Sequence, residues 1–166
     1  EFAPIVIAGY GRVGRRVGEV LTRAGQPFVA IDSDSMLVSR ARKSGNPVYY
    51  GNVSQPGLLQ SLGAGGAQII MVTLNDPEET TRLVSILKQQ YPDVAILARG
   101  HNLEICQELV RLGSAGVVSE NVEASLELSR MALELMGGPD AQREEVLDSF
   151  RRQYHDQIYQ LPSDDP

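Results

Sequence analysis

Residues 4–14, which read PIVIAGYGRVG, decide the fold. An apolar run that suits a buried strand leads directly into the pattern G-x-G-x-x-G, and the apolar spacing of a helix begins at Val13. A second apolar run, residues 28–31, ends at Asp32. The sequence thus places a strand, a glycine loop and a helix in order, followed by a strand that ends in an acidic residue. This order predicts a pocket for a nucleotide diphosphate. A purely structural glycine turn is the alternative.

Each residue of the loop has its own physical reason. Gly9 permits the tight turn, Gly11 lets a phosphate approach the backbone, and Gly14 lets the helix lie close to the strand. The free N–H groups and the positive dipole end at the helix start hold the anion. Arg12 is placed to cover the phosphates, the alternative being a solvated arginine.

Asp32 indicates which nucleotide the pocket takes. Its carboxylate would accept hydrogen bonds from both ribose hydroxyls of an adenosine. The same charge would repel a 2′-phosphate. The sequence therefore predicts NAD(H), or a fragment such as AMP or ADP, in preference to NADP(H).

Composition narrows the class of protein. The chain has 166 residues, of which 42% are hydrophobic, so we expect one large domain or a domain with an appendage. A net charge of −6 argues against a nucleic-acid surface. Cys106 is the single cysteine and is expected to be a buried thiol. No apolar run approaches the ~20 residues that cross a bilayer. Because the chain starts without methionine, we expect it to be a piece of a longer protein.

Short runs rich in Val and Ile alternate with helical patterns along the whole chain. We expect strands at 4–9, 27–32, 47–50, 68–73, 94–99 and 115–118, and helices at 12–25, 34–44, 55–62, 77–91, 102–112 and 121–136. This order predicts an α/β, doubly wound (Rossmann) fold with a six-stranded, mostly parallel sheet and a C-terminal helical extension.

Ligands of open α/β sheets bind beyond the carboxyl ends of the strands, so the residues at those ends are the next candidates. Residues 50–53 form an adenine contact or an ordinary turn, and residues 75–76 cap a helix or contact a second ribose. Arg99 ends the fifth strand, where an arginine usually meets an anion, so we expect a phosphate contact. The candidate ligand-binding residues are Gly9, Tyr10, Gly11, Arg12, Val13, Gly14, Asp32, Ser33, Asn52, Val53, Thr73, Leu74, Asn75 and Arg99.

The helix expected at 121–136 has two apolar stripes on nearly opposite faces. One consists of Ala124, Leu128, Met131, Ala132 and Leu135, and the other of Val122, Leu126, Leu133 and Met136. A helix that lies on a sheet needs one such stripe, so the second needs a partner, either the last segment of this chain or another subunit. The spacing of apolar residues in that last segment predicts an amphipathic helix over 140–160. These residues are Leu147, Phe150, Tyr154, Ile158 and Leu161.

Catalytic residues do not accompany the glycine loop. No Tyr is followed by Lys at the fourth position, and Lys43 and Lys88 are the only lysines. The stretch after the sixth strand is too short for a substrate domain. We therefore expect a binding module without catalysis and without a metal site. A small NAD-dependent oxidoreductase and a separate subunit that docks on a channel are the alternatives.

The chain resembles the RCK/KTN (TrkA-N) regulatory domains of potassium channels and transporters, above all the C-terminal domains of bacterial cation:proton antiporters of the glutathione-gated potassium efflux type. The matching segments are 7–14 (IAGYGRVG), 31–34 (IDSD), 48–52 (VYYGN), 75–78 (NDPE), 96–99 (ILAR), 112–117 (LGSAGV), 120–126 (ENVEASL) and 150–152 (FRR). The resemblance implies a nucleotide-binding domain over 1–137, which includes the helix 121–136, and a C-terminal helix and tail over 138–166.

This resemblance also implies a cytoplasmic domain of an inner-membrane antiporter, which binds NAD(H) or AMP and biases the gate of the membrane part. Such domains pair as homodimers through the last long helix, which favours another subunit as the partner of the second stripe. Asn52 stands where many relatives have Asp, and Tyr154 stands where the glutathione-gated members have an Asn of the glutathione site. Glutathione sensing is therefore not carried over to this chain.

Overall fold

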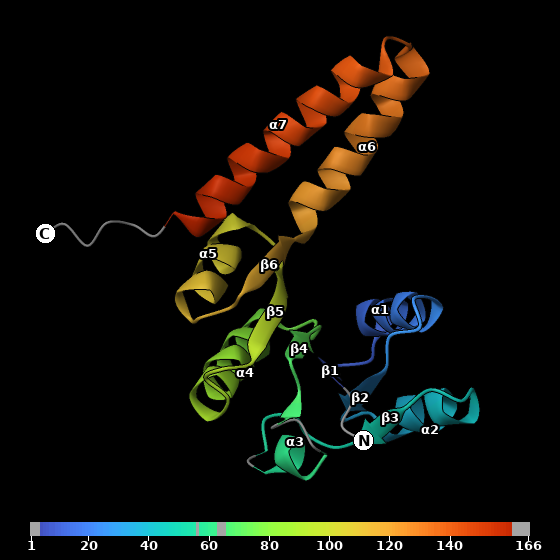
Figure 1. Cartoon of the computed structure of the whole chain (residues 1–166), viewed down its shortest axis with the longest axis vertical. Helices are drawn as coiled ribbons and strands as arrows, with labels where there is room; N and C mark the ends of the chain where they lie inside the picture. The colour runs from blue at the N-terminus through green and yellow to red at the C-terminus, as the bar shows by residue number, and fades with distance from the viewer. Residues whose placement is uncertain (1–3, 56, 63–65, 161–166) are drawn as a thin grey trace, which may run out of the picture.

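The strands form one sheet in the computed structural model, which describes residues 4–55, 57–62 and 66–160. Its order is β3-β2-β1-β4-β5-β6, and every neighbouring pair is parallel (Figure 1). The strands are β1 (Ile5–Ala8), β2 (Phe28–Asp32), β3 (Val48–Tyr50), β4 (Ile69–Val72), β5 (Ala95–Gly100) and β6 (Gly116–Ser119). The doubly wound fold expected from the alternating pattern is confirmed, and the strand bounds differ from those expected by one residue at an end.

Helices cover both faces of this sheet, with α1 and α2 on one side and α4 and α5 on the other (Figure 1). The helices are α1 (Arg12–Arg23), α2 (Ser35–Lys43), α3 (Leu58–Ser61), α4 (Pro77–Gln90), α5 (Leu103–Arg111), α6 (Glu120–Met136) and α7 (Asp140–Tyr159). The helix expected at 55–62 begins later, because the N–H of Gln55 closes a turn on the carbonyl of Asn52 at 2.9 Å. Residue 56 and residues 63–65 lie outside the described residues.

Among the described residues, two clusters of buried side chains cover the sheet, one on each face. Alternate residues of a strand point to opposite faces, so Ile7 belongs to the cluster under α1 and α2 while Val6 and Ala8 belong to the other. Leu83 and Leu87 of α4 are fully buried against the second face. Burial of each such side chain stabilises the fold by roughly 1.5–3 kcal/mol.

The register of the central strands brings the ends of β1, β2 and β4 to one edge of the sheet. Ala8 lies opposite Ile31 on one side and opposite Val72 on the other. The next residues along the chain, Gly9, Asp32 and Thr73, are therefore neighbours. The strand order reverses between β1 and β4, which is where ligands of this fold bind.

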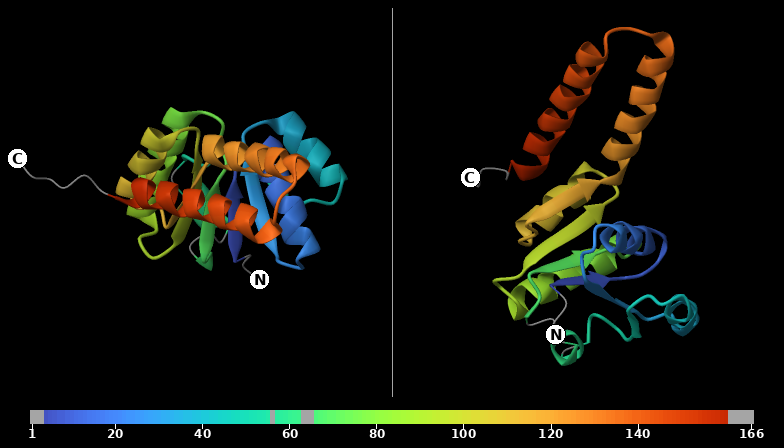
Figure 2. Two further views of the ribbon diagram at one scale, coloured as in Figure 1. Left: turned by 90° about the horizontal axis from the view of Figure 1, so that it is seen from above. Right: turned by 45° about the vertical axis from the view of Figure 1, so that its right-hand side comes forward.

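Helices α6 and α7 form a hairpin that projects from the β6 side of the sheet (Figures 1 and 2). Val122 and Leu126 of α6 are buried against Leu147 of α7, and Tyr154 packs against this cluster. The base of α7 is tied to the sheet, because the N–H of Val117 donates to the Tyr159 hydroxyl at 3.1 Å. The described part of the C-terminal segment is therefore helical as expected, and residues 161–166, including Leu161, lie outside the described residues.

The first apolar stripe of α6 is not covered by the sheet. Leu128, Met131 and Leu135 of its first stripe are 68%, 49% and 89% exposed. The second stripe is covered in part by the last segment of the same chain, at Val122 and Leu126. Pairing with α7 fixes the direction of α6, and the hairpin projects away from the sheet (Figure 2).

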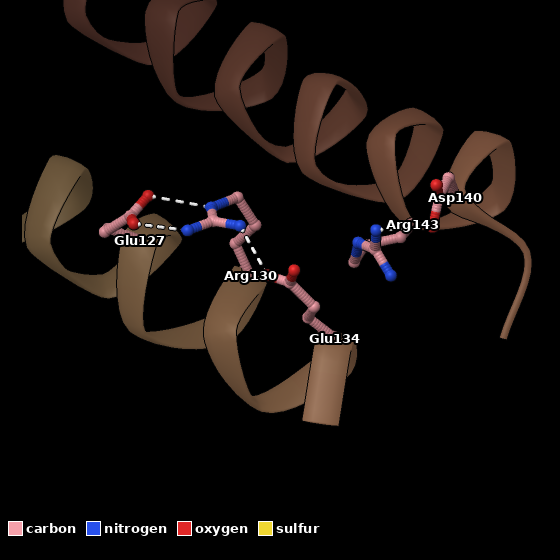
Figure 3. Close-up of polar contacts among 5 residues, drawn as sticks. All are labelled: Glu127, Arg130, Glu134, Asp140 and Arg143. Atoms are coloured by element: carbon pink, nitrogen blue, oxygen red, sulfur yellow. Dashed lines mark hydrogen bonds and ion pairs between the residues drawn. The ribbon is translucent and has the colours of Figure 1, made fainter. Parts of the chain in front are cut away.

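Ion pairs near the tip of the hairpin lie within single helices. Arg130 pairs with Glu127 and Glu134 of α6 at 2.7 Å each, and Arg143 pairs with Asp140 of α7 at 2.7 Å (Figure 3). These hydrogen bonds raise the pKa of Arg130 and lower the pKa of Glu127. Each pair joins two residues of the same helix and has an exposed carboxylate, so these pairs add little to the contact between α6 and α7, which the apolar cluster at the base supplies.

Within residues 4–55, 57–62 and 66–160, no helix combines the length and the apolar character needed to cross a membrane.

Candidate functional site

The glycine loop connects β1 to α1 in a conformation that requires its glycines. Gly9 has a φ of 102°, which L side chains rarely adopt. A Cβ atom on Gly14 would lie 2.1 Å from the carbonyl oxygen of Gly9, whereas one on Gly11 would meet nothing within 4 Å. The turn and the close approach of helix to strand are therefore steric requirements. At Gly11 the backbone faces open space.

Thr73, at the end of β4, supports the loop from beneath. Its buried hydroxyl lies 2.6 Å from the carbonyl oxygen of Gly9, to which it donates, and 3.2 Å from that of Ala8. The sequence predicts this residue as a ligand contact. Because its hydroxyl is engaged below the loop, Thr73 holds the two strand ends together and does not line either cleft described next.

Asp32 joins the glycine loop to the end of β2. Its Oδ2 accepts a hydrogen bond from the backbone N–H of Tyr10 at 2.7 Å, and its Oδ1 accepts one from the N–H of Asp34 at 2.8 Å. The Tyr10 ring is buried against Phe28, and this burial raises the pKa of its hydroxyl. Tyr10 therefore contributes its backbone to the site, while its side chain belongs to the core.

A cavity of about 460 Å³ opens beside this carboxylate, and we call it the Asp32 cleft. Its lining comes from the ends of the strands and from α4: Gly9, Ile31, Asp32, Ser33, Gly51, Asn52, Val53, Ser54, Leu74, Glu79 and Arg82. The Asn52 side chain accepts from the N–H of Ser54 at 2.9 Å, so the turn that the sequence left as an alternative is formed and also lines the cleft.

Sequence reasoning missed Glu79 and Arg82 of the Asp32 cleft. They lie three residues apart on α4, whose start is fixed by Asp76: its Oδ1 accepts from the N–H of Glu79 at 2.9 Å. The capping role considered for residues 75–76 is thus filled by Asp76. The helical spacing after this cap could have indicated that Glu79 and Arg82 lie together, because residues three apart share one helix face.

A second cavity, of about 650 Å³, lies on the other side of Leu74, and we call it the Arg99 cleft. It is lined by Arg12, Val13, Arg16, Leu74, Asn75, Pro77, Thr80, Arg99, Gly100, His101, Ile105 and Glu120. Leu74 lines both clefts, so the two are adjacent. Of the predicted candidates, Arg12, Val13, Asn75 and Arg99 lie here, whereas Asp32, Ser33, Asn52 and Val53 line the Asp32 cleft.

Arg99 is held between two elements at this edge. Its Nη2 donates to the Asn75 side chain, and its Nη1 lies 2.7 Å from Oε1 of Glu120, the first residue of α6. The side chain is only 15% exposed. Sequence reasoning predicted an anionic partner and placed a phosphate there; the anion in this structure is the Glu120 carboxylate.

The start of α1 offers hydrogen-bond donors to a ligand. Side chains cap the N-termini of α2, α4, α5 and α6, whereas no side chain of the described residues caps α1. Its first N–H groups and dipole therefore remain available to an anion. The described residues hold no cluster of three or more His, Cys, Asp or Glu side chains suited to a metal ion.

Comparisons with known proteins agree with this architecture. The C-terminal domain of Kef from Shewanella denitrificans, solved in its AMP-bound form, matches with a TM-score of 0.81 and 26% identity over 93% of this chain and 94% of that chain. The TrkA-N domain of the inner membrane protein ybaL from Escherichia coli matches with a TM-score of 0.72 and 26% identity over 82% and 98%.

The GsuK channel bound to NAD matches with a TM-score of 0.59 and 28% identity, over 69% of this chain and 20% of that one. Residues 5–120 match the family model of the TrkA-N domain. That match spans well over half of the chain and includes the glycine loop, both clefts and the complete sheet. The chain belongs to the TrkA-N domain family.

Proposed function

We propose that this chain is the nucleotide-binding regulatory domain of a membrane-bound potassium or cation:proton antiporter, and that its ligand is AMP or NAD(H). The observation that carries the proposal is the Asp32 cleft, which is lined by Gly9 of the glycine loop and by Asp32 at the end of β2. It occurs in a chain of the family in which the Kef domain was solved with AMP and the GsuK channel with NAD.

In this proposal each part of such a ligand has its own place. The adenosine occupies the Asp32 cleft, with its ribose hydroxyls at the free lone pairs of Asp32. The phosphate next to the adenosine lies against the N–H groups at the start of α1, over Gly11, with Arg12 beside it. AMP ends at this point, whereas the second half of NAD(H) extends into the Arg99 cleft.

In this proposal the nucleotide is a signal and not a reagent. Among the described residues, no lysine lines either cleft, and the Tyr10 ring is buried against Phe28. The lining thus lacks the Tyr and Lys pair that the oxidoreductase alternative would need. A nucleotide changes transport only through different affinities for two arrangements of the domain, so ligand binding and gating are reciprocal. The domain lies on the cytoplasmic side of the inner membrane.

We also propose that a second copy of the chain covers an open sheet face. An apolar groove of about 720 Å³ lies beside α1, and Val13, Val17, Met71, Leu97 and Val118 are among its lining residues. In a doubly wound fold a helix normally covers this face, but α6 projects away from it (Figure 1). The exposed stripe of Leu128, Met131 and Leu135 offers apolar cover of the required kind.

Charge supports the same pairing. α1 carries Arg12, Arg15, Arg16 and Arg23 against the single acid Glu19. Acidic residues outnumber basic ones on α6 and α7. A hairpin from one copy that lies along α1 of another therefore brings opposite charges together, which favours a homodimer through α6.

Thermal unfolding with added nucleotides tests the proposed ligand. AMP, NAD and NADH are expected to raise the Tm, because a ligand at 100 times its Kd stabilises the folded state by about 2.7 kcal/mol. NADP is the matched control and is expected to give a smaller shift, since its 2′-phosphate would meet Asp32. Unchanged Tm values with all the adenosine nucleotides would contradict the proposal.

A further inference from the structure

We infer that Arg99 couples the nucleotide to the hairpin: a dinucleotide that reaches the Arg99 cleft competes with Glu120 for the Arg99 guanidinium and thereby loosens the start of α6. This inference rests on the proposed function and adds a mechanism of regulation to it. Arg99 acts as a positioning residue whose two partners belong to different parts of the molecule.

The partners of Arg99 define this role. Asn75 follows β4 and lines the Arg99 cleft, whereas Glu120 begins α6. One guanidinium contacts both, with 2.7 Å between its Nη1 and the Glu120 carboxylate. Its Nε is buried and has no hydrogen-bond partner among the described residues. Both Nη atoms of the guanidinium are thus engaged, so a ligand phosphate that approaches them competes with Glu120.

Arg99 and Glu120 also stand at the boundary between two cavities. Both residues line the Arg99 cleft, and both line the apolar groove beside the hairpin base. A change in this one ion pair therefore alters the lining of both the Arg99 cleft and the apolar groove. No long relay of side chains is required, because a single contact joins the ligand edge of the sheet to the first residue of the projecting helix.

Glu120 has no second close partner that would replace Arg99 among the described residues. His101 is the second basic group near its carboxylate, with Nδ1 at 3.7 Å from Oε2, and this side chain is largely exposed. When a ligand phosphate takes Arg99, Glu120 loses its close partner and faces the incoming negative charge. The first turn of α6 then keeps its Ser119 cap, which accepts from the N–H of Val122 at 3.4 Å, and loses its ion pair with β5.

Ligand length separates this effect from a general change in affinity. NADH extends into the Arg99 cleft and must displace Glu120, whereas AMP ends at the glycine loop and does not. The charge-removing variant Glu120→Gln is therefore expected to bind NADH roughly fivefold more tightly and to bind AMP with unchanged affinity.

The test is a calorimetric titration of the whole 166-residue chain with NADH and with AMP. Glu123→Gln is the matched control: Glu123 lies three residues further along α6, pairs with Arg151 of α7 at 3.0 Å and does not line the Arg99 cleft. This variant is expected to bind both nucleotides as the wild type does. Arg99→Gln is expected to weaken NADH binding and to leave AMP binding unchanged.

Hydrogen exchange of the α6 amides provides a second readout. A purely structural role of Arg99 would not make this exchange depend on the nucleotide. NADH is expected to speed exchange of the amides at 122–126 in the wild type, AMP is not, and in Glu120→Gln exchange is fast with or without NADH. The inference is overturned if Glu120→Gln changes the NADH and AMP affinities by the same factor, or changes neither. Absence of binding of both nucleotides to the wild type is a different result and contradicts the proposed function itself.

Discussion

The carboxylate of Asp32 accepts a hydrogen bond from the backbone N–H of Tyr10 at 2.7 Å, so the acidic residue that ends β2 also holds the glycine loop in place. Its other oxygen fixes the turn into α2 through the N–H of Asp34 at 2.8 Å. Ligand recognition and loop geometry therefore depend on the same side chain, and substitutions of Asp32 must be interpreted with both roles in mind.

Asp32→Ala removes both acceptors and is expected to lower the free energy of unfolding by about 1–2 kcal/mol, because two backbone N–H groups lose their partner. Asp32→Asn has the same shape and keeps one carbonyl acceptor, so it is expected to cost less. Because Asp32→Asn lacks the negative charge, it is also expected to reduce the difference between the affinities for NADH and NADP. Urea unfolding and competition titrations measure the two effects. An Asp32→Asn variant that still discriminates fully against NADP would disprove the role of the charge.

Thr73→Val tests the support beneath the loop. The variant keeps the volume of the side chain but leaves the buried carbonyl of Gly9 without its donor at 2.6 Å. We expect a loss of about 1–3 kcal/mol in the free energy of unfolding, measured by urea denaturation. Thr73→Ser keeps the hydroxyl and serves as the control. Equal stability of the Val and Ser variants would show that this hydrogen bond contributes nothing.

Two glycine substitutions separate folding from binding. Gly14→Ala places a Cβ 2.1 Å from the carbonyl oxygen of Gly9, so the loop or α1 must move, and we expect a loss of several kcal/mol in stability. Gly11→Ala places a Cβ in open space at a residue with φ −74°, which alanine tolerates. The urea midpoint is expected to drop for Gly14→Ala and to stay unchanged for Gly11→Ala. A comparable drop for Gly11→Ala would mean that the space above the loop is not open.

The sequence was sufficient for the sheet and for the glycine loop. Both are local signals: a buried parallel strand is a short apolar run, and the loop lies between the first strand and its helix, as in residues 4–14. The same holds for Asp32, since the end of β2 is fixed by the apolar run before it. These features need no knowledge of which distant residues meet.

The hairpin and the Arg99 contacts could not be derived in this way. An apolar stripe shows that a face of α6 needs cover, but not which surface supplies it, and Leu126 in fact packs on Leu147. Arg99 was expected to contact a phosphate. In the structure it pairs with Glu120, which is 21 positions along the chain and approaches because β5 and β6 are adjacent. Glu79 and Arg82 enter the Asp32 cleft through the packing of α4.

Substitutions on the two faces of α6 test the proposed dimer. Leu128→Glu puts a charge on the exposed stripe and is expected to halve the molecular mass in light scattering without loss of stability. Leu126→Ala acts on the buried side and is expected to cost about 2–5 kcal/mol in stability. The mass of the Leu126→Ala protein should remain that of a dimer. A Leu128→Glu protein with unchanged mass would rule out this stripe as the contact.

Tyr10 gives the stability of the protein an alkaline dependence. Burial raises its pKa above the usual value of 10.0, so above that pH the unfolded chain ionises while the folded chain still holds the proton. The unfolded state then binds fewer protons, and stability falls as pH rises through and beyond this value. Tyr10→Phe removes this contribution. Urea unfolding between neutral and alkaline pH should show a smaller decline for the variant, and parallel curves would contradict the assignment.

The central claim is that the glycine loop and the Asp32 cleft bind an adenine nucleotide, and calorimetric titration of AMP and NADH into the wild type and Gly11→Ala tests it most directly. We expect saturable binding of both nucleotides to the wild type. Binding to Gly11→Ala should fall at least about tenfold while its stability is retained, because the new methyl group occupies the path of the phosphate to the backbone. Undiminished binding to Gly11→Ala, or no binding to the wild type, would contradict the account.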